Sequence, residues 1–244
     1  MKISVVTICR NAQATIGRTI ESFLRQDHAD KELVIVDGMS DDGTLGVART
    51  FGADNIRIHS GRDDGIYHAM NKGLGLYHGE AMGFLNADDA FHDTGVLSKI
   101  AGALANADAA YGDLVMVHPR SNRIVRRWRA GLPASFRGGW MPPHPTFYAR
   151  RSLVDAVGEF NLRYDIAADY DFMLRALEIH RGRLRYIPHT LVDFATGGRS
   201  TSGIAALVRA NLQCLHSRRR HLGVPLLDWA LIAKPARKLR QLRP

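Results

Sequence analysis

The chain has 244 residues, 45% of them hydrophobic, and a formal net charge of +9. This length fits one large α/β domain, or one domain with a tail, and no apolar run reaches the roughly 18 residues that span a membrane. The two cysteines, Cys9 and Cys214, lie far apart in the sequence and match no disulfide framework or zinc pattern. No signal peptide is expected, because the first apolar run is short and soon reaches Arg10.

Strands and helices alternate in the first part of the chain. Apolar, β-branched runs predict buried strands at 3–9, 32–36, 55–59 and 81–86. Apolar residues at helical spacing predict helices at 12–26, 44–51, 66–78 and 94–106. This alternation is typical of a mostly parallel, doubly wound sheet with helices on both faces.

The pattern changes after Ala109, where shorter strands and later helices are predicted. The strands are expected at 109–117, 123–128, 145–149 and 191–195. The helices are expected at 151–157, 169–180, 204–222 and 226–242.

Acidic residues follow three of the four N-terminal strands. Asp37 ends the second strand, Asp63 with Asp64 follows the third, and Asp88 with Asp89 follows the fourth. Ligands of open α/β sheets bind beyond the carboxyl ends of the strands, so these carboxylates are expected at one edge. Asp37 and Asp64 suit either contacts to a base or ribose or ordinary turns. The adjacent pair suits either a Mg²⁺ or Mn²⁺ site, which relieves the repulsion between the two carboxylates, or a helix N-cap.

Three polar features lie in the second part of the chain. Asp169 begins a predicted helix and is either its N-cap or a general base that faces a pocket. His144 stands between two prolines and is either a ligand of a metal or diphosphate or a structural hydrogen-bonding residue. The loop at 197–202, which includes Arg199, either closes over a diphosphate or is an ordinary connection.

Most of the positive charge lies at the C-terminal end. Residues 217–244 carry eight Lys and Arg against one Asp, a net charge of +7. A nucleic-acid-binding protein would spread cations along a face and interleave aromatic residues, so no nucleic acid partner is expected. Aliphatic residues and Trp229 beside these cations favour contact with an anionic membrane surface. The alternative is an ordinary C-terminal helix docked on the domain.

Five motifs stand in the order found in family 2 glycosyltransferases with the GT-A fold, which the sequence resembles over about residues 3–202. They are Ser4-Val5-Val6-Thr7 with Asn11, the run Val36-Asp37-Gly38 to Thr44, Asn71-Lys72-Gly73, Phe84 to Asp89, and Ala168-Asp169-Tyr170-Asp171. The stretch from Arg127-Trp128 to Thr146 makes the chain similar to small bacterial enzymes of exopolysaccharide, colanic-acid-type or glycolipid synthesis.

The resemblance implies an inverting transfer of a sugar from a nucleotide-diphosphate-sugar to a hydroxyl of a saccharide or a polyprenyl-diphosphate-linked acceptor. Asp169 is the implied general base, and Mn²⁺ or Mg²⁺ the implied cofactor, with a UDP-sugar favoured over a GDP-sugar. The implied donor-binding residues are Thr7, Asn11, Asp37, Asp64, Asn71, Asp88 and Arg199. The implied metal ligands are Asp88, Asp89 and His144. A nucleotide-sugar hydrolase, or a relative that binds without catalysis, is the alternative.

The same resemblance divides the chain and places it in the cell. Residues 1–108 are expected to form a nucleotide-binding half, 109–203 an acceptor-binding half, and 204–244 a basic helical extension. The expected location is cytoplasmic and peripheral at the inner face of the cell membrane. Two positions depart from the family pattern, because Asn86 replaces the first Asp of the metal motif and Ala168 replaces a common Glu. The processive Gln-x-x-Arg-Trp motif is absent, which favours the addition of one sugar at a time.

Overall fold

The computed structural model describes residues 1–119, 121, 123–196 and 204–225. Its strands are β1 (Ile3–Cys9), β2 (Lys31–Asp37), β3 (Ile56–Ser60), β4 (Ala81–Phe84), β5 (Ala90–Phe91), β6 (Ala109–Val117), β7 (Ile124–Trp128), β8 (Tyr148–Arg150) and β9 (Leu184–Ala195). Its α-helices are α1 (Ile16–Leu24), α2 (Thr44–Thr50), α3 (Ile66–Leu74), α4 (Val96–Leu104), α5 (Arg151–Val157), α6 (Ala168–Leu174) and α7 (Ile204–Leu222). Short 3₁₀ turns η1 (Phe136–Gly138) and η2 (His144–Thr146) and a π-helical turn η3 (Arg175–Ile179) complete it.

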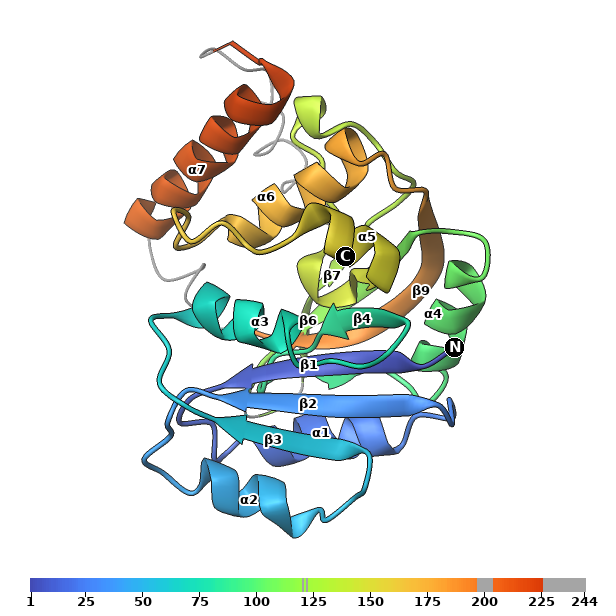
Figure 1. The fold of residues 1–244 in the computed structure, drawn as a ribbon, viewed down its shortest axis with the longest axis vertical. Helices are drawn as coiled ribbons and strands as arrows, with labels where there is room; N and C mark the ends of the chain where they lie inside the picture. Colours follow the sequence, from blue (N-terminus) through green and yellow to red (C-terminus); the bar gives the residue numbers. More distant parts are fainter. Residues whose placement is uncertain (120, 122, 197–203, 226–244) are drawn as a thin grey trace.

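One sheet runs through the molecule in the order β3-β2-β1-β4-β8-β6-β9-β5, with β7 paired to β6 (Figure 1). The first four strands in this order are parallel to one another, β4 is antiparallel to β8, and β6 is parallel to β9. The strands β7 and β8 run antiparallel to β6. This arrangement confirms the predicted α/β class, with parallel pairing of all four N-terminal strands and mixed pairing beyond them.

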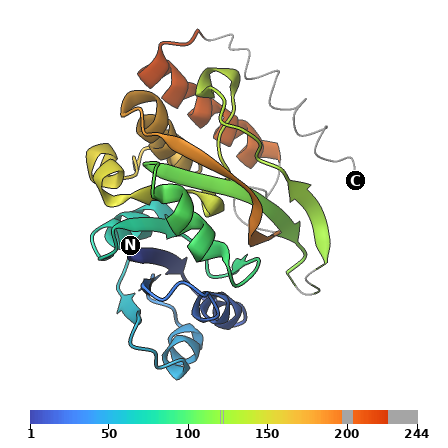
Figure 2. The same cartoon turned by 90° about the vertical axis from the view of Figure 1, so that its right-hand side faces the viewer.

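The sheet separates two hydrophobic cores. Residues of α3, α5 and α6 pack on one face, together with Cys214 of α7. Residues of α1, α2 and α4 pack on the other face. Figures 1 and 2 show α5, α6 and α7 gathered on the side of the sheet opposite α1 and α2. Continuous burial of β1, β2 and β4 explains why these strands read as unbroken apolar runs.

Two predicted elements differ from the structure for identifiable reasons. The last strand begins at Leu184 and not near residue 191, because pairing with β6 extends through residues whose own pattern is polar. The helix expected at 169–180 is α-helical from Ala168 to Leu174 and continues as the π-helical turn η3. The helix expected at 204–222 is confirmed as α7, whereas the one expected at 226–242 lies outside the described residues.

No helix in the described parts of the chain combines the length and apolar character that a membrane crossing needs.

The helix α7 is held to the domain by a buried carboxylate. The Asp171 side chain is 1% exposed and accepts hydrogen bonds from the Ser217 hydroxyl at 2.8 Å and from Arg175 Nε at 2.9 Å. The Nε2 atom of His221 lies 3.1 Å from the same carboxylate. Arg218 is 1% exposed and donates a hydrogen bond to the Tyr170 hydroxyl at 3.1 Å. One cation of the basic 217–244 segment is therefore buried in the domain.

Replacing Asp171 with Ala is expected to lower the free energy of unfolding by about 3 kcal/mol, because it leaves the Arg175 guanidinium without its buried counter-charge. Urea denaturation measures this change. The matched control is Glu21→Ala in α1, which removes an exposed i,i+4 pair to Arg25 at 3.3 Å and is expected to cost at most about 1 kcal/mol. Equal losses in the two variants would contradict the role assigned to Asp171.

Candidate active site

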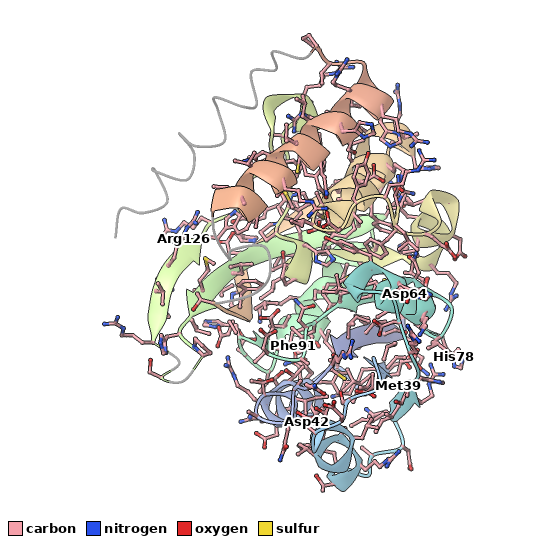
Figure 3. The ribbon with its side chains drawn as sticks, turned by 90° about the vertical axis from the view of Figure 1, so that its left-hand side faces the viewer. Met39, Asp42, Asp64, His78, Phe91 and Arg126 are labelled. Atoms are coloured by element: carbon pink, nitrogen blue, oxygen red, sulfur yellow. The ribbon has the colours of Figure 1, made fainter. Side chains whose placement is uncertain are left out.

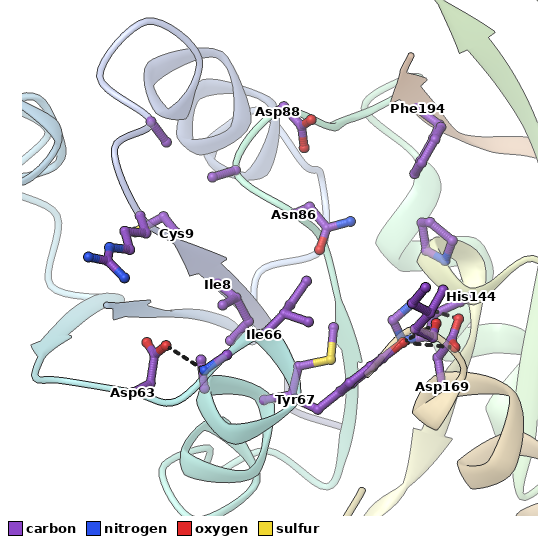
Figure 4. A pocket seen from close by; sticks show the side chains of 18 of the residues that line it. Ile8, Cys9, Asp63, Ile66, Tyr67, Asn86, Asp88, His144, Asp169 and Phe194 are labelled. Atoms are coloured by element: carbon purple, nitrogen blue, oxygen red, sulfur yellow. Dashed lines mark hydrogen bonds and ion pairs between the residues drawn. The ribbon is translucent and has the colours of Figure 1, made fainter. Parts of the chain in front are cut away.

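A cavity of about 1,100 Å³ opens at the carboxyl ends of β1 and β4. Polar side chains of the N-terminal half line one side of it: Arg10, Asn11, Asp63, Asp64, Asn86 and Asp88. His144, Asp165 and Asp169 contribute from the second half of the chain. Figure 4 shows Asp63 on one side of this pocket and Asp169 with His144 on the other. The pocket therefore joins the two halves that the sequence distinguishes.

Asp88 and Asp89 are separated by burial, although they are adjacent in sequence. Asp88 lines the pocket, and its partial burial raises the pKa of its carboxyl group. Asp89 is fully buried and accepts hydrogen bonds from the Ala195 N–H at 2.9 Å and the Asn86 amide at 3.1 Å. Burial, and then the neighbouring charge of Asp88, raise the pKa of Asp89 well above its ordinary value. Asp89 thus ties the loop after β4 to the end of β9, and it is Asp88 that meets the pocket.

Asp169 begins α6 and is held by groups from other elements. The Tyr67 hydroxyl, on α3, lies 2.6 Å from the Ile166 carbonyl and 3.1 Å from Asp169 Oδ1, so its single proton is shared between these two acceptors. The Nδ1 atom of His144 lies 4.0 Å from Asp169 Oδ2. The Asp169 side chain remains 22% exposed. Burial, and then the Asp169 charge, raise the pKa of Tyr67, so its hydroxyl stays protonated and remains a donor. Burial lowers the pKa of His144 below its usual value, against the opposing effect of Asp169, which favours a neutral imidazole.

Three of the predicted donor-binding residues bond to the protein itself and are not among the described residues that line this pocket. The Thr7 hydroxyl donates to the Leu85 carbonyl at 2.7 Å. The Asn71 amide bonds to the backbone of Phe160 through both of its ends, at 3.1 and 2.8 Å. Asp37 is fully buried and accepts hydrogen bonds from the Ser40 N–H and from the Ser40 and Ser60 hydroxyls. These hydrogen bonds lower the pKa of Asp37 although its burial opposes them. These contacts are the ones expected if Asp37 stabilises the turn that follows β2.

Asn11 and Asp64 do line the pocket. Asn11 has a left-handed backbone with φ 53°, and its side-chain oxygen accepts the Asp41 N–H at 3.1 Å. The Asp64 side chain, in the loop before α3, is 79% exposed, and its carboxylate lies 3.7 Å from Nδ1 of His68 (Figure 3 labels Asp64). Arg199 lies outside the described residues.

The structure adds pocket residues to the donor-binding and metal-binding sets that the resemblance implies. Asp63, the neighbour of Asp64, lines the pocket and accepts the Gly65 N–H at 3.2 Å. Tyr67 supports Asp169, but its position in an apolar helical pattern makes it look like an ordinary core residue. Trp128 and Phe194 also line the pocket from strands distant in sequence. No local pattern in the sequence predicts these contacts.

The residues present can hold a divalent cation only together with oxygens from a ligand. Within the described ranges, no group of three or more His, Cys, Asp and Glu side chains is arranged to bind a metal. Asp88 offers one carboxylate to the pocket. Figure 4 shows the Asn86 side chain near Asp88, whereas His144 lies beside Asp169 and not beside Asp88. Mg²⁺ and Mn²⁺ usually take one or two carboxylates, with phosphate oxygens and water in their other positions. This set therefore fits a cation shared with a diphosphate.

Comparison with known proteins identifies the family. Residues 4–162 match the family model for glycosyl transferase family 2. The PGL/p-HBAD biosynthesis glycosyltransferase of Mycobacterium tuberculosis (strain ATCC 25618 / H37Rv) is 34% identical over 181 residues, which cover 70% of this chain and 68% of that protein. An uncharacterized glycosyltransferase of the same strain is 29% identical over 186 residues, which cover 71% of this chain and 68% of that protein.

Two solved structures share the fold at low identity. Residues 1–349 of TarS from S. aureus, in complex with UDP, superpose with a TM-score of 0.70 at 18% identity, covering 99% of this chain and 70% of that one. The mannosyltransferase PcManGT from Pyrobaculum calidifontis, in complex with GDP-Man and Mn²⁺, gives a TM-score of 0.70 at 18% identity, covering 96% and 68%. The chain therefore belongs to glycosyl transferase family 2 and is a glycosyltransferase of the GT-A fold, which confirms the resemblance seen in its five motifs.

Proposed function

We propose that this enzyme transfers one sugar at a time from a nucleotide-diphosphate-sugar to an acceptor hydroxyl, with inversion and with Asp169 as the general base. The observation that carries the proposal is the separation of charged groups across one pocket. Asp63 and Asp169 lie on opposite sides of this pocket (Figure 4), and Asp64 and Asp88 belong to its lining. A base on the far side of the donor suits direct attack by the acceptor oxygen, and direct attack inverts the anomeric carbon.

The donor is proposed to lie along the N-terminal half of the pocket. Exposed Asp64, with Asn11 nearby in the same lining, offers hydrogen-bond acceptors to a base and ribose. Asp88 would hold Mn²⁺ or Mg²⁺ against the diphosphate, and such a cation stabilises the negative charge of the leaving nucleotide. UDP is proposed as the carrier because the family resemblance favours it; the solved structures of TarS with UDP and of PcManGT with GDP-Man support a nucleotide-sugar donor of either kind. Asp89 and His144 are not part of this proposed metal site, since Asp89 is buried and His144 stands beside Asp169.

Asp169 is suited to accept the proton of the acceptor hydroxyl. The Tyr67 hydroxyl holds Oδ1, while Oδ2 faces the His144 ring at 4.0 Å. A hydrogen bond to one oxygen orients the carboxylate and leaves the other available to the acceptor.

The acceptor is proposed to be a saccharide or a polyprenyl-diphosphate-linked sugar, with the enzyme cytoplasmic and peripheral at the inner face of the membrane. The cations of 217–244 support contact with anionic lipid. Arg218 is excluded from that contact because it is buried against Tyr170, whereas Arg219 and Arg220 are exposed.

The substitution Asp169→Asn is expected to lower kcat for sugar transfer by about 100-fold to 10,000-fold, because general-base catalysis is lost while the shape is kept. Release of UDP from a UDP-sugar, with and without acceptor, measures this effect. Binding of UDP with Mn²⁺ should stay unchanged. The matched control is Asp155→Asn on α5, an exposed position, which should retain full transfer. Full transfer by Asp169→Asn would refute the assignment, and equal UDP release without acceptor would indicate a hydrolase.

The substitution Asp88→Asn is expected to remove most of the stabilisation that UDP gives in the presence of Mn²⁺, because the cation loses its protein carboxylate. A ligand at 100 times its Kd stabilises the folded state by about 2.7 kcal/mol, which a thermal-shift titration resolves. The control is Asp54→Asn in the exposed loop before β3. An Asp88→Asn protein with an unaltered Mn²⁺-dependent shift would exclude Asp88 as the ligand.

A further inference from the structure

The segment between Asp113 and Asp155 carries positive charge alone. It contains eight arginines and no lysine, aspartate or glutamate. The segment includes β7 and the loops on both sides of it. The folded part of the chain therefore has a basic region of its own, separate from residues 217–244.

Four of these arginines are exposed to solvent and have no acidic partner. They are Arg123, Arg127, Arg129 and Arg137. No carboxylate of the described residues forms an ion pair with any of them. By contrast, the exposed Arg183 is paired with Asp108 at 3.1 Å. The positive charge around β7 is therefore available to a partner that carries negative charge.

The strand β7 lies at an edge of the sheet. Among the described strands it pairs with β6 alone. Figures 2 and 3 show β7 at the margin of the molecule, where Figure 3 labels Arg126. Cations on an edge strand also discourage pairing with another sheet. That role does not account for Arg129 and Arg137, because both lie beyond the end of β7.

Aliphatic side chains are exposed beside these arginines. Ile124 and Val125 of β7 are 40% and 57% exposed, and Leu132 in the following loop is 78% exposed. Exposed aliphatic groups add nothing to a purely solvated charged face. A surface that contacts an anionic membrane combines both kinds of side chain, because the cations attract the lipid headgroups and the aliphatic groups enter between them.

The register of β6 with β7 puts an aliphatic and a cationic side chain on one face. Ile124 lies opposite Val117 and Arg127 lies opposite Val115. The two valines are two residues apart on β6, so Ile124 and Arg127 share a face. Trp128 lies on the other face of β7 and lines the active-site pocket. A single strand therefore separates this face from the pocket.

A groove beside this face can receive an anionic headgroup. Its volume is about 430 Å³, and both Arg127 and Arg129 line it. Asp113 also lines it, but Asp113 Oδ1 accepts hydrogen bonds from the Tyr186 hydroxyl and the Ala130 N–H, each at 2.8 Å. A guanidinium group matches the geometry of a phosphate and binds it through two parallel hydrogen bonds. The groove therefore suits a phosphate group.

We propose that the exposed surface formed by Ile124, Val125, Arg127 and Arg129, here called the β7 surface, docks on an anionic phospholipid bilayer. The aliphatic side chains enter the headgroup region and the arginines bind lipid phosphates. This inference rests on the membrane location given under the proposed function and adds a contact made by the folded domain. A nucleic acid is the competing partner, and it fits less well because the exposed apolar groups are aliphatic and cannot stack on bases.

Binding of the full chain to vesicles is the first test. Phosphatidylcholine vesicles with and without about one-third phosphatidylglycerol are compared by co-sedimentation at physiological salt. The chain is expected to bind the anionic vesicles at least about tenfold more tightly than the neutral ones. A DNA duplex and an RNA hairpin serve as other polyanions. Tighter binding to either of them than to the anionic vesicles would overturn the proposal.

Paired substitutions locate the contact. Arg127→Gln with Arg129→Gln is expected to weaken binding to anionic vesicles by at least about fivefold, because each cation at such a surface contributes about fivefold. The matched control is Arg49→Gln with Arg181→Gln, which also removes two exposed cations that lack ion pairs among the described residues. The control should lose at most about twofold. Equal losses in the two proteins would refute the β7 surface, as would unaltered binding by the first, which would leave the whole contact to residues 217–244.

A fluorescent label tests the contact directly. Ile124→Cys supplies an exposed thiol, whereas the native Cys9 and Cys214 are buried. An environment-sensitive dye on this thiol is expected to shift its emission to shorter wavelength on anionic vesicles. The same dye at Thr50→Cys, an exposed position on α2, should show no shift. An unchanged spectrum at Ile124→Cys on vesicles that bind the protein would contradict the docking.

The docking and the proposed activity fail separately. Transfer to a soluble saccharide needs no bilayer, so the Arg127→Gln/Arg129→Gln protein should keep this transfer and its thermal shift with UDP and Mn²⁺. The retained shift also shows that the variant is folded. A chain that shows the emission shift on vesicles but releases no UDP from a UDP-sugar would reject the proposed function and leave the docking in place.

Discussion

Parallel pairing of β1 with β2 and β4 determines where every polar loop of the donor region lies. The register joins Cys9 to Asp37 and Val6 to Phe84, so the chain leaves three strands at one edge of the sheet. Backbone hydrogen bonds between buried strands admit no slippage, because a shift by one residue would turn apolar side chains toward the wrong face. Asn11, Asp64 and Asp88 reach one pocket because of this register, although they are distant in sequence.

Burial then divides the carboxylates into two groups. Asp37 and Asp89 are enclosed by the protein and bonded to its own donors, so they shape loops. Asp88 and Asp169 meet the pocket. A buried polar group needs hydrogen-bond partners, and a side chain that already bonds to the protein has less hydrogen-bonding capacity for a ligand. Burial therefore distinguishes Asp88 from Asp89, which are adjacent and identical in the sequence.

The second half of the chain supplies the remaining walls through contacts across long separations. Tyr67 and Asp169 are joined by a hydrogen bond between residues 102 positions apart. Trp128 and Phe194 line the same pocket because β6 pairs with both β7 and β9. The last of the described helices, α7, is bound to α6 through Asp171, two residues after Asp169 on the same helix, which couples the packing of α7 to the position of Asp169.

The sequence by itself determined the α/β class, the parallel N-terminal strands, the family and the acids that belong to one edge of the sheet. Apolar periodicity and motif order depend only on the order of residues along the chain, so both can be recognised without a structure. It also placed Asp169 at the start of a helix. Only the tertiary structure decided which of these side chains reach the pocket, since Asp37, Asn71 and Thr7 bond to the protein outside the pocket lining while Asp63 and Asp64 belong to it. The contact between Tyr67 and Asp169 and the burial of Arg218 were likewise settled by packing. Each of these depends on strand pairing and side-chain burial between segments far apart in the chain, which no local pattern encodes.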